Sequence, residues 1–339
     1  MAVERQHVKE QDKIQRRSNF DPVESNLTEE QVKLEASRCL NCKNPRCVKG
    51  CPVNIQIPEF IQAIKEGNME KAGEIIRQTS MLPSVCGRVC PQERQCEGNC
   101  VLGIKGSPVA IGALERYVGD NTKAEMPEIK PSGKKVAVVG SGCAGMTAAC
   151  DLRKEGHEVE VFEALHELGG VLRYGIPPFR LPRTVLDREI KNLKAMGVKF
   201  HTNVIVGKSI TLKQLKEDGF DAIFICSGAG LPKMLNVPGE NLNGVFSANE
   251  FLTRVNLMHA GQPDSPTPLR VGKKAAIFGG GNVAMDAART AVRVGFEEVY
   301  IIYRRTEKEL PARLEEIRHA KEEGIVFKFL YAPKEIIGE

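Results

Sequence analysis

The stretch KKVAVVGSGCAGMTAACDLRKEG, residues 134–156, decides the fold of the region around it. Its first residues form an apolar run typical of a buried strand, a glycine turn follows, and the rest has the apolar spacing of a helix. A second apolar strand, EVEVFEA at 158–164, comes directly after the helix. The stretch therefore predicts a strand–helix–strand unit and a parallel sheet.

The glycine turn in this unit is a dinucleotide-binding fingerprint. Gly140, Gly142 and Gly145 fit the spacing G-x-G-x-x-G, and Glu163 ends the second strand about 20 residues further on. Gly140 allows the tight turn, Gly142 lets the backbone approach a pyrophosphate, and Gly145 packs the helix on the strand. The helix N-terminus favours the anion, and the Glu163 carboxylate can accept from ribose hydroxyls. An unliganded glycine turn is the less favoured alternative.

The same pattern returns near the end of the chain, in KKAAIFGGGNVA at 273–284. Its spacing is G-x-G-x-x-A, carried by Gly279, Gly281 and Ala284 with Asn282 between them. The next strand ends differently, because Arg304 and Arg305 stand where the acidic residue would be. Guanidinium groups bind a 2′-phosphate that an acid would repel, so the sequence favours NADP(H) over NAD(H). The alternative is a solvated arginine pair.

Eight of the eleven cysteines lie in two contiguous groups. RCLNCKNPRCVKGCP, residues 38–52, has the spacing C-x2-C-x4-C-x3-C-P, and CGRVCPQERQCEGNC, residues 86–100, has C-x3-C-x5-C-x3-C. Such runs, with proline after a cysteine, resemble bacterial ferredoxins, so two [4Fe–4S] clusters are favoured over zinc, and disulfides come last. The other three, Cys143, Cys150 and Cys226, are predicted to pack in the apolar interior.

In ferredoxin runs the cysteine before proline binds the other cluster. If Cys51 does so, the first cluster needs a fourth ligand from the second group. The resulting thiols for the first cluster are Cys39, Cys42, Cys47 and Cys100. Those for the second cluster are Cys51, Cys90 and Cys96. The remaining position of the second cluster is open at this point, between Cys86 and a carboxylate.

Length and linkers suggest three domains: 1–130, 131–265 and 266–339. The first is predicted to be helical, with two helices broken near Gly67 and a further helix in PVAIGALERYVGD at 108–120. The net charge of +5 is small for this length and gives no case for nucleic acid. No apolar run is long enough to span a membrane, and the charged N-terminus lacks a secretion signal, so we expect a cytoplasmic protein.

Taken together, these motifs resemble the small (β) subunit of the NADPH-dependent glutamate synthase family. They also resemble the large subunit of NADH-dependent reduced ferredoxin:NADP oxidoreductase and the N-terminal part of dihydropyrimidine dehydrogenase. Besides the cysteine groups, LPSVCGRVC, FEALHELGGVLRYGIPPFRLP and YRRTEKELPA carry the resemblance. It implies an α/β protein with an N-terminal α-helical iron–sulfur domain, followed by two Rossmann-like units of a glutathione-reductase-like flavoprotein.

The resemblance also implies cofactors and their residues. FAD would lie on the first fingerprint and Glu163, with the flavin lined by LGGVLRYGIPPFRLP, including Gly169, Gly170, Arg173 and Tyr174. NADPH would lie on Gly279–Ala284 and on Arg304 and Arg305. The first cluster would take Cys39, Cys42, Cys47 and Cys100, and the second Cys51, Cys90, Cys96 and Glu115. Cys86 would then be a nonligand. No separate set of catalytic side chains is expected.

In function, the resemblance implies an NADPH-dependent iron–sulfur flavoprotein oxidoreductase. As an electron-input subunit it would serve a large, α-type glutamate synthase subunit. The alternative is the large subunit of the flavin-based electron-bifurcating ferredoxin:NADP oxidoreductase, whose partner is a small [2Fe–2S] flavoprotein. A hypothesis of another class is a non-catalytic cluster-bearing scaffold. The family's FAD domain resumes after its NADPH domain, whereas this chain ends at Glu339 without that C-terminal FAD half. We expect a fragment, or a partner that completes it.

Overall fold

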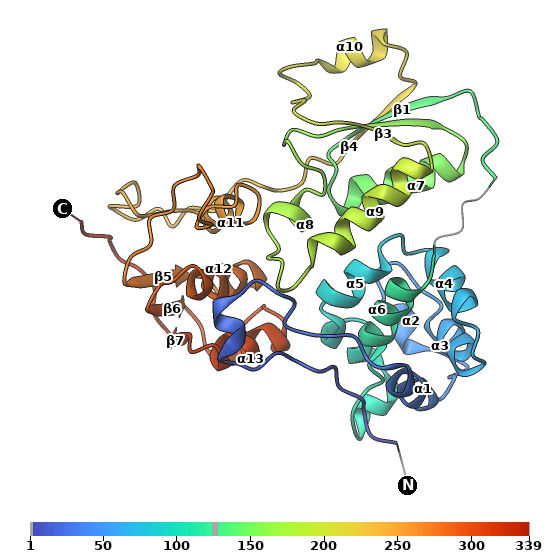
Figure 1. Ribbon diagram of the computed structural model, residues 1–339, viewed down its shortest axis with the longest axis horizontal. Helices are drawn as coiled ribbons and strands as arrows, with labels where there is room; N and C mark the ends of the chain where they lie inside the picture. The colour runs from blue at the N-terminus through green and yellow to red at the C-terminus, as the bar shows by residue number, and fades with distance from the viewer. Residues whose placement is uncertain (1–2, 124–127, 339) are drawn as a thin grey trace. The chain divides into compact units, whose positions relative to one another are not determined.

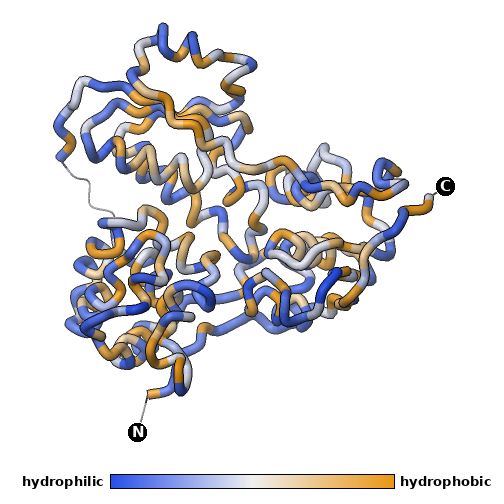
Figure 2. The backbone as a smooth tube through the Cα atoms, turned by 180° about the vertical axis from the view of Figure 1, so that it is seen from behind, coloured by the Kyte–Doolittle hydropathy of each residue, from blue (hydrophilic) through white to orange (hydrophobic). Residues whose placement is uncertain are grey.

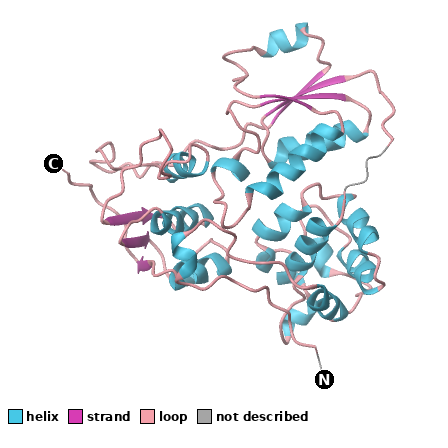
Figure 3. Cartoon of the chain, in the orientation of Figure 1, coloured by secondary structure: helices cyan, strands magenta, loops and turns pink. Residues whose placement is uncertain are grey.

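The computed structural model describes residues 3–123 and 128–338 and forms two compact units. The first unit takes the described residues within 1–10, 24–170 and 180–227, and the second those within 11–23, 171–179 and 228–339. Helices and strands of each unit are labelled in Figure 1, and Figure 3 separates the helical segments from the two small sheets.

The first unit begins with a helical part that contains both cysteine groups. Its helices are α1 (Glu29–Ser37), α2 (Arg46–Gly50), α3 (Ile57–Lys65), α4 (Met69–Arg77), α5 (Pro83–Val89) and α6 (Ile111–Asn121), with short 3-10 turns η2 (Gln92–Arg94), η3 (Glu97–Asn99) and η4 (Val101–Ile104). The break between α3 and α4 confirms the predicted one, and the Asn68 side chain caps α4 by accepting from the Lys71 N–H. Phe60, Ile76 and Leu114 lie fully buried in the shared core.

Helices α5 and α6 of this part touch backbone to backbone. A Cβ placed on Gly87 would lie 2.6 Å from the backbone nitrogen of Arg116, so only glycine allows this approach. The close contact brings the C-terminal end of α5, where the second cysteine group begins, against the middle of α6, where Glu115 lies.

A parallel sheet completes the first unit. Its strands β1 (Lys135–Val139), β2 (Glu158–Phe162), β3 (Lys199–His201) and β4 (Ala222–Ile225) are ordered β3-β2-β1-β4, and its helices are α7 (Cys143–Lys154), α9 (Arg183–Ala195) and α10 (Leu212–Glu217). In register, Val138 of β1 pairs with Val161 of β2 and Phe224 of β4. The strands stand out as hydrophobic in Figure 2, as the apolar runs predict.

The second unit holds the second strand–helix–strand repeat. Strands β5 (Lys274–Phe278), β6 (Glu298–Tyr303) and β7 (Val326–Phe329) form a parallel sheet in that order, accompanied by α8 (Val171–Tyr174), α11 (Ala248–Asn256), α12 (Asn282–Arg293), α13 (Leu314–Glu322) and the 3-10 turn η5 (Glu307–Glu309). Met285, Ala288 and Ile301 are fully buried in its core. The 3-10 turn η1 (Gln15–Ser18), from the N-terminal segment, packs against α12 in this unit.

These two parallel sheets and the helical N-terminal part confirm the predicted fold class. Within the residues that the structure describes, no helix is both long and apolar enough to cross a lipid bilayer.

Candidate functional site

The four thiols assigned to the first cluster line a single pocket. Cys39 follows α1, Cys47 lies on α2, and the pocket is lined by Cys39, Cys42, Cys47 and Cys100 among mainly apolar neighbours such as Leu40 and Val101. Burial raises the pKa of the Cys39 thiol, and raises that of Cys47 to about 11, with a smaller contribution from the neighbouring Cys100. Residues more than fifty positions apart in sequence are thus gathered as a soft-metal site requires.

The second set of predicted ligands also gathers in one place. Cys51 ends α2, Cys90 ends α5, and Cys96 begins η3. Burial raises the pKa of the Cys96 thiol, and the charges of the adjacent Glu97 and of Glu115 and Cys51 raise it further. The close-packed pair α5 and α6 places Glu115 near Cys90, whose charge adds to the strong effect of burial in raising the pKa of this carboxyl group.

Glu115 is an unusual carboxyl group in this unit. It is 5% exposed, and its Oε1 atom has no hydrogen-bond partner among the described residues. A buried oxygen without a partner is costly unless something binds it, so this atom fits a ligand to a metal centre. The residues present at both cysteine groups therefore fit iron–sulfur clusters.

Cys86 lies near Glu115 and Cys90, among the predicted ligands of the second cluster. Its thiol is hydrogen-bonded with Cys90, the residue that caps the C-terminus of α5, and with the buried Ser80. The hydrogen bond with Cys90 and burial both raise the pKa of Cys86. Both Glu115 and Cys86 lie near Cys90. The choice of Glu115 instead of Cys86 as the fourth ligand of the second cluster therefore stays a prediction.

The first glycine fingerprint turns between β1 and α7, as its spacing predicts. A Cβ on Gly145 would lie 1.9 Å from the Gly140 carbonyl oxygen, so the helix packs on the turn only with glycine there. The carboxylate of Glu163 is 6% exposed and already engaged: the Ser141 backbone N–H and hydroxyl donate to Oε2 at 2.9 and 2.5 Å, and the Leu165 N–H donates to Oε1 at 2.9 Å.

Ser141 is a residue that the sequence did not single out. Its side chain is fully buried, and its hydroxyl also accepts a hydrogen bond of 2.9 Å from the Gly169 N–H. Ser141 therefore connects the glycine turn to Glu163 and to the loop of Gly169 and Gly170. The signal was its position between the two glycines, where a small hydroxyl side chain faces the end of the next strand.

The other predicted flavin residues, Arg173 and Tyr174, lie on α8 in the second unit. There the buried Asn256 side chain of α11 donates to the Tyr174 carbonyl oxygen at 3.1 Å and to that of Gly175 at 3.3 Å. Asn256 therefore fixes the end of α8.

The second fingerprint turns between β5 and α12. The Gly279 N–H donates to the Ile302 carbonyl at 3.0 Å, and the Asn282 side chain accepts from the Arg313 N–H at 2.9 Å. Ala284, within the first turn of α12, is buried, and Gly281 caps the helix. The N-terminus of α12 thus lies at the carboxyl end of the parallel strand β5, where a dinucleotide pyrophosphate binds in such folds.

Arg304 and Arg305 follow the last residue of β6 and are both exposed. Within the described part of the chain, neither guanidinium group makes a hydrogen bond or an ion pair with another side chain. Two unengaged cations at this end of β6 are available to a phosphate.

One prediction about the cysteines is wrong. Cys150 is buried and Cys226 half-buried, but Cys143 is exposed, because it is the first residue of α7 at the glycine turn.

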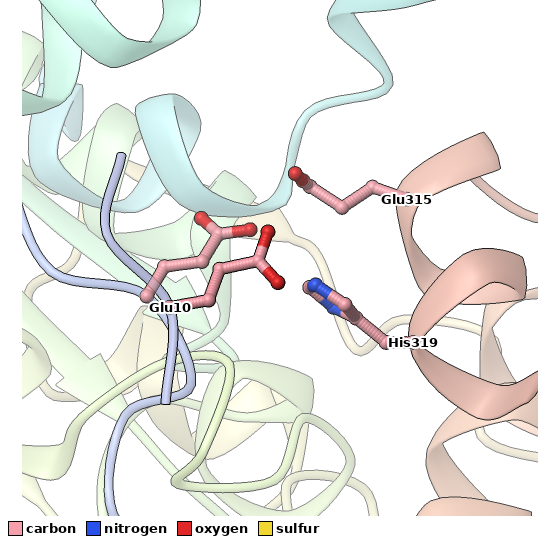
Figure 4. A group of neighbouring side chains, drawn as sticks. Glu10, Glu315 and His319 are labelled. Atoms are coloured by element: carbon pink, nitrogen blue, oxygen red, sulfur yellow. The ribbon is translucent and has the colours of Figure 1, made fainter. Parts of the chain in front are cut away.

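Glu315 and His319, outside the predicted sites, project from one face of α13 (Figure 4), as their spacing of four residues requires.

Two family models match this chain. Residues 16–126 match the dihydropyrimidine dehydrogenase domain II, 4Fe-4S cluster, and residues 120–339 match the pyridine nucleotide-disulphide oxidoreductase family. The two matches together cover both cysteine groups and both glycine fingerprints.

Curated relatives extend over nearly the whole chain. The glutamate synthase [NADPH] small chain of Escherichia coli is 39% identical over 326 residues, which is 94% of this chain and 69% of the relative. The putative oxidoreductase UacF of Escherichia coli is 38% identical over 331 residues, 95% of this chain and 52% of the relative. The chain thus spans between about half and about two thirds of the length of these two proteins.

Among solved structures, Mycobacterium tuberculosis FprA in complex with NADPH is similar with a TM-score of 0.51 and 24% identity, over 62% of each chain. This likeness bears on the fold. The sequence matches bear on the family. With a helical 4Fe-4S part and two parallel dinucleotide-type units in one sequence, the chain belongs to the pyridine nucleotide-disulphide oxidoreductases, and within them to the NADPH-dependent oxidoreductase family of the glutamate synthase small chains.

Proposed function

We propose that this chain is the electron-input part of an NADPH-dependent oxidoreductase that uses NADPH, FAD and two [4Fe–4S] clusters. The observation that carries the proposal is the convergence of Cys39, Cys42, Cys47 and Cys100 on one pocket, in the same unit as a glycine fingerprint with its acidic partner. When bound, the nicotinamide and flavin would supply two-electron hydride chemistry and the clusters one-electron chemistry.

The chain's own residues would bind and orient these groups. The N-terminus of α7 and the carboxylate of Glu163 would hold the FAD pyrophosphate and ribose, with Ser141 keeping the carboxylate in place. The N-terminus of α12 would hold the NADPH pyrophosphate, while Arg304 and Arg305 would bind its 2′-phosphate. Gly169, Gly170, Arg173 and Tyr174 would line the flavin, as the family resemblance implies. The domain boundaries at 130 and 265 stay predictions.

We further propose that a larger subunit of the glutamate synthase type accepts the electrons. The support is the 39% identity to a protein named as the small chain of such an enzyme. A cytoplasmic location accords with this, because a reducing compartment keeps the clustered thiols available to metal. Purification of the native protein together with the proteins bound to it tests the proposed partner. A preparation without a larger companion chain would count against it.

The cluster content is the first testable prediction. Protein purified without oxygen is expected to hold roughly eight iron and eight sulfide per chain, because two four-iron clusters fit the two cysteine groups. Iron and acid-labile sulfide analysis, with a visible absorption spectrum, measures this. Stoichiometric zinc without visible absorption would rule out the clusters.

The second testable prediction concerns the choice between NADPH and NADH. Changing Arg304 and Arg305 to alanine removes charge-assisted contacts with the 2′-phosphate, each worth about 1.5–3 kcal/mol at most. The affinity for NADPH is expected to fall steeply, and that for NADH to change little, in titrations of both nucleotides. Lys308→Ala, which changes an exposed cation on the following 3-10 turn η5, serves as the control. Equal affinity of the unchanged protein for NADH and NADPH would contradict the assignment.

A further inference from the structure

A single arginine connects the nucleotide-binding part of the first unit to both helices of the second cysteine group. Arg188 of α9 donates to the Gly119 carbonyl at 3.2 Å and to the Asp120 carbonyl at 3.1 Å. Both carbonyls lie in the last turn of α6, where helix carbonyls lack partners within the helix and the macrodipole is negative. The guanidinium thus caps the helix that carries Glu115.

The same guanidinium also contacts α5. Arg188 Nη2 lies 2.5 Å from the Ser84 hydroxyl oxygen, two residues before Cys86. It lies 3.3 Å from one carboxylate oxygen of Asp120 as well. One side chain therefore joins the helix of Cys86 and Cys90 to the helix of Glu115.

Asp120 holds this junction from the other side. Its carboxylate accepts a bidentate pair from Arg88 at 2.9 and 2.6 Å, and a hydrogen bond of 2.7 Å from the Asn26 side chain. Burial alone would raise the pKa of Asp120, but Arg88 outweighs burial and the pKa falls to about 2. The carboxylate is therefore ionised at neutral pH and available to Arg188.

On its other side, α9 belongs to the FAD-type half of the unit. It packs against α7, the helix that begins at the first glycine fingerprint, and it also contacts α5. The C-terminal Lys154 of α7 adds a second polar contact, at 3.4 Å from the Arg77 carbonyl oxygen on α4. Across this contact, Arg188 makes four hydrogen bonds to residues of α5 and α6.

We propose that Arg188 is a positioning residue: it fixes the second cysteine group, and with it Glu115, relative to the first dinucleotide site. The inference rests on the proposed function, because it concerns how electrons from a flavin would reach the second cluster. Ligand geometry responds to the partners that orient the ligands. A shift of α6 would move the Glu115 carboxylate and alter the second cluster, whereas the first cluster's ligands have no contact with Arg188 among the described residues.

The test uses the full chain with both clusters, in the variants Arg188→Gln and Arg188→Lys. Dithionite-reduced protein is examined by EPR, and the midpoint potential of each cluster is measured. We expect Arg188→Gln to change the signal and the potential of the second cluster and to leave those of the first unchanged. Lysine keeps the charge but loses the planar fork, so partial rescue is expected. Reduction of the second cluster by NADPH should slow by roughly tenfold, the lower range seen for outer-shell partners of metal sites.

Two further variants make the result decisive. Lys191→Gln changes an exposed cation on the same helix and should behave as the unchanged protein. Ser84→Ala removes one acceptor of Arg188 without touching α9, and a smaller shift of the same cluster is expected from it even if Arg188→Gln folds poorly.

The positioning role would be overturned if folded Arg188→Gln protein kept the EPR signal and the potential of the second cluster unchanged. If Arg188→Gln does not fold, the same result in Ser84→Ala would overturn it. Equal changes in both clusters would overturn it too, because they indicate general loosening. Absence of two cluster signals from the unchanged protein would instead overturn the proposed function, so the two failures are distinguishable.

Discussion

Replacing Glu323 with glutamine is expected to lower the free energy of unfolding of the second unit by about 3–5 kcal/mol, the usual loss when one partner of a buried ion pair is removed. Glu323 is fully buried at the end of α13. The substitution keeps the shape of the side chain and removes only its charge, so the loss would report the ion pairs themselves.

Three arginines surround this carboxylate. Arg289 donates to its two oxygens at 3.1 and 2.8 Å, and Arg293 at 2.7 and 3.1 Å, both from α12. The Nε atom of Arg16, on η1, lies 3.0 Å from Oε1. Arg293 and Arg289 also stack on the Phe179 ring, 3.9 and 4.6 Å from its centre. Without the charge of Glu323, Arg289 would keep its ion pair with Glu316 and Arg16 its ion pair with Glu322, and all three buried arginines would lose a carboxylate partner.

The same pairs predict a dependence on pH. Burial alone would raise the pKa of Glu323, but Arg293 and Arg289 lower it from 4.5 to about 2. A carboxyl group whose pKa is lower in the folded state than in the unfolded state stabilises the folded state. Its contribution is complete above the unfolded pKa of 4.5 and is lost as the pH falls through the folded pKa of about 2. The difference in stability between the unchanged protein and Glu323→Gln should therefore shrink between pH 4.5 and pH 2.

Urea unfolding followed by circular dichroism at several pH values measures both effects. The matched control is Glu307→Gln, which breaks an exposed pair with Lys321 in the same unit and is expected to change stability by about 0–1 kcal/mol. Similar losses in the two variants would show that the buried network contributes no more than a surface pair.

Replacing Glu115 with alanine is expected to change the EPR signal of one reduced cluster and to weaken that cluster's retention of iron. The reason is the buried Oε1 atom without a partner, beside Cys90 on the close-packed neighbouring helix. An oxygen is a harder ligand than a thiolate, so its loss should shift that cluster's potential as well. The other cluster, with its four thiols in the first pocket, should keep its signal.

The control for this prediction is Cys86→Ala, since Cys86 is the competing fourth ligand and lies in the same group. Both signals are expected to persist nearly unchanged in that variant. If Cys86→Ala removes one signal while Glu115→Ala removes none, the ligand assignment is reversed. Paired EPR spectra and iron analyses of the two variants decide between them.

The sequence predicted most of the fold from local patterns. The apolar runs before Gly140 and Gly279 became β1 and β5, and the break near Gly67 separates α3 from α4, because apolar strand runs, glycine turns and helix periodicity are all properties of short segments. The family resemblance, and not spacing, selected Glu115 as a candidate ligand. The same local reasoning failed at Cys143, where an apolar neighbourhood in sequence did not mean a buried place in space.

By itself, the sequence determined the residue types that chemistry requires: the thiols, the glycines, the acid after β2 and the arginines after β6. Only the tertiary structure decided which of them meet. The first cysteine pocket closes because the segment after η3 returns Cys100 to α2, and Glu115 loses water because Gly87 lets α5 and α6 touch. Arg188 caps α6, and Arg16 joins Glu323, across distances in sequence that carry no periodic signal. Such contacts depend on packing between elements, and packing is a property of the folded chain as a whole.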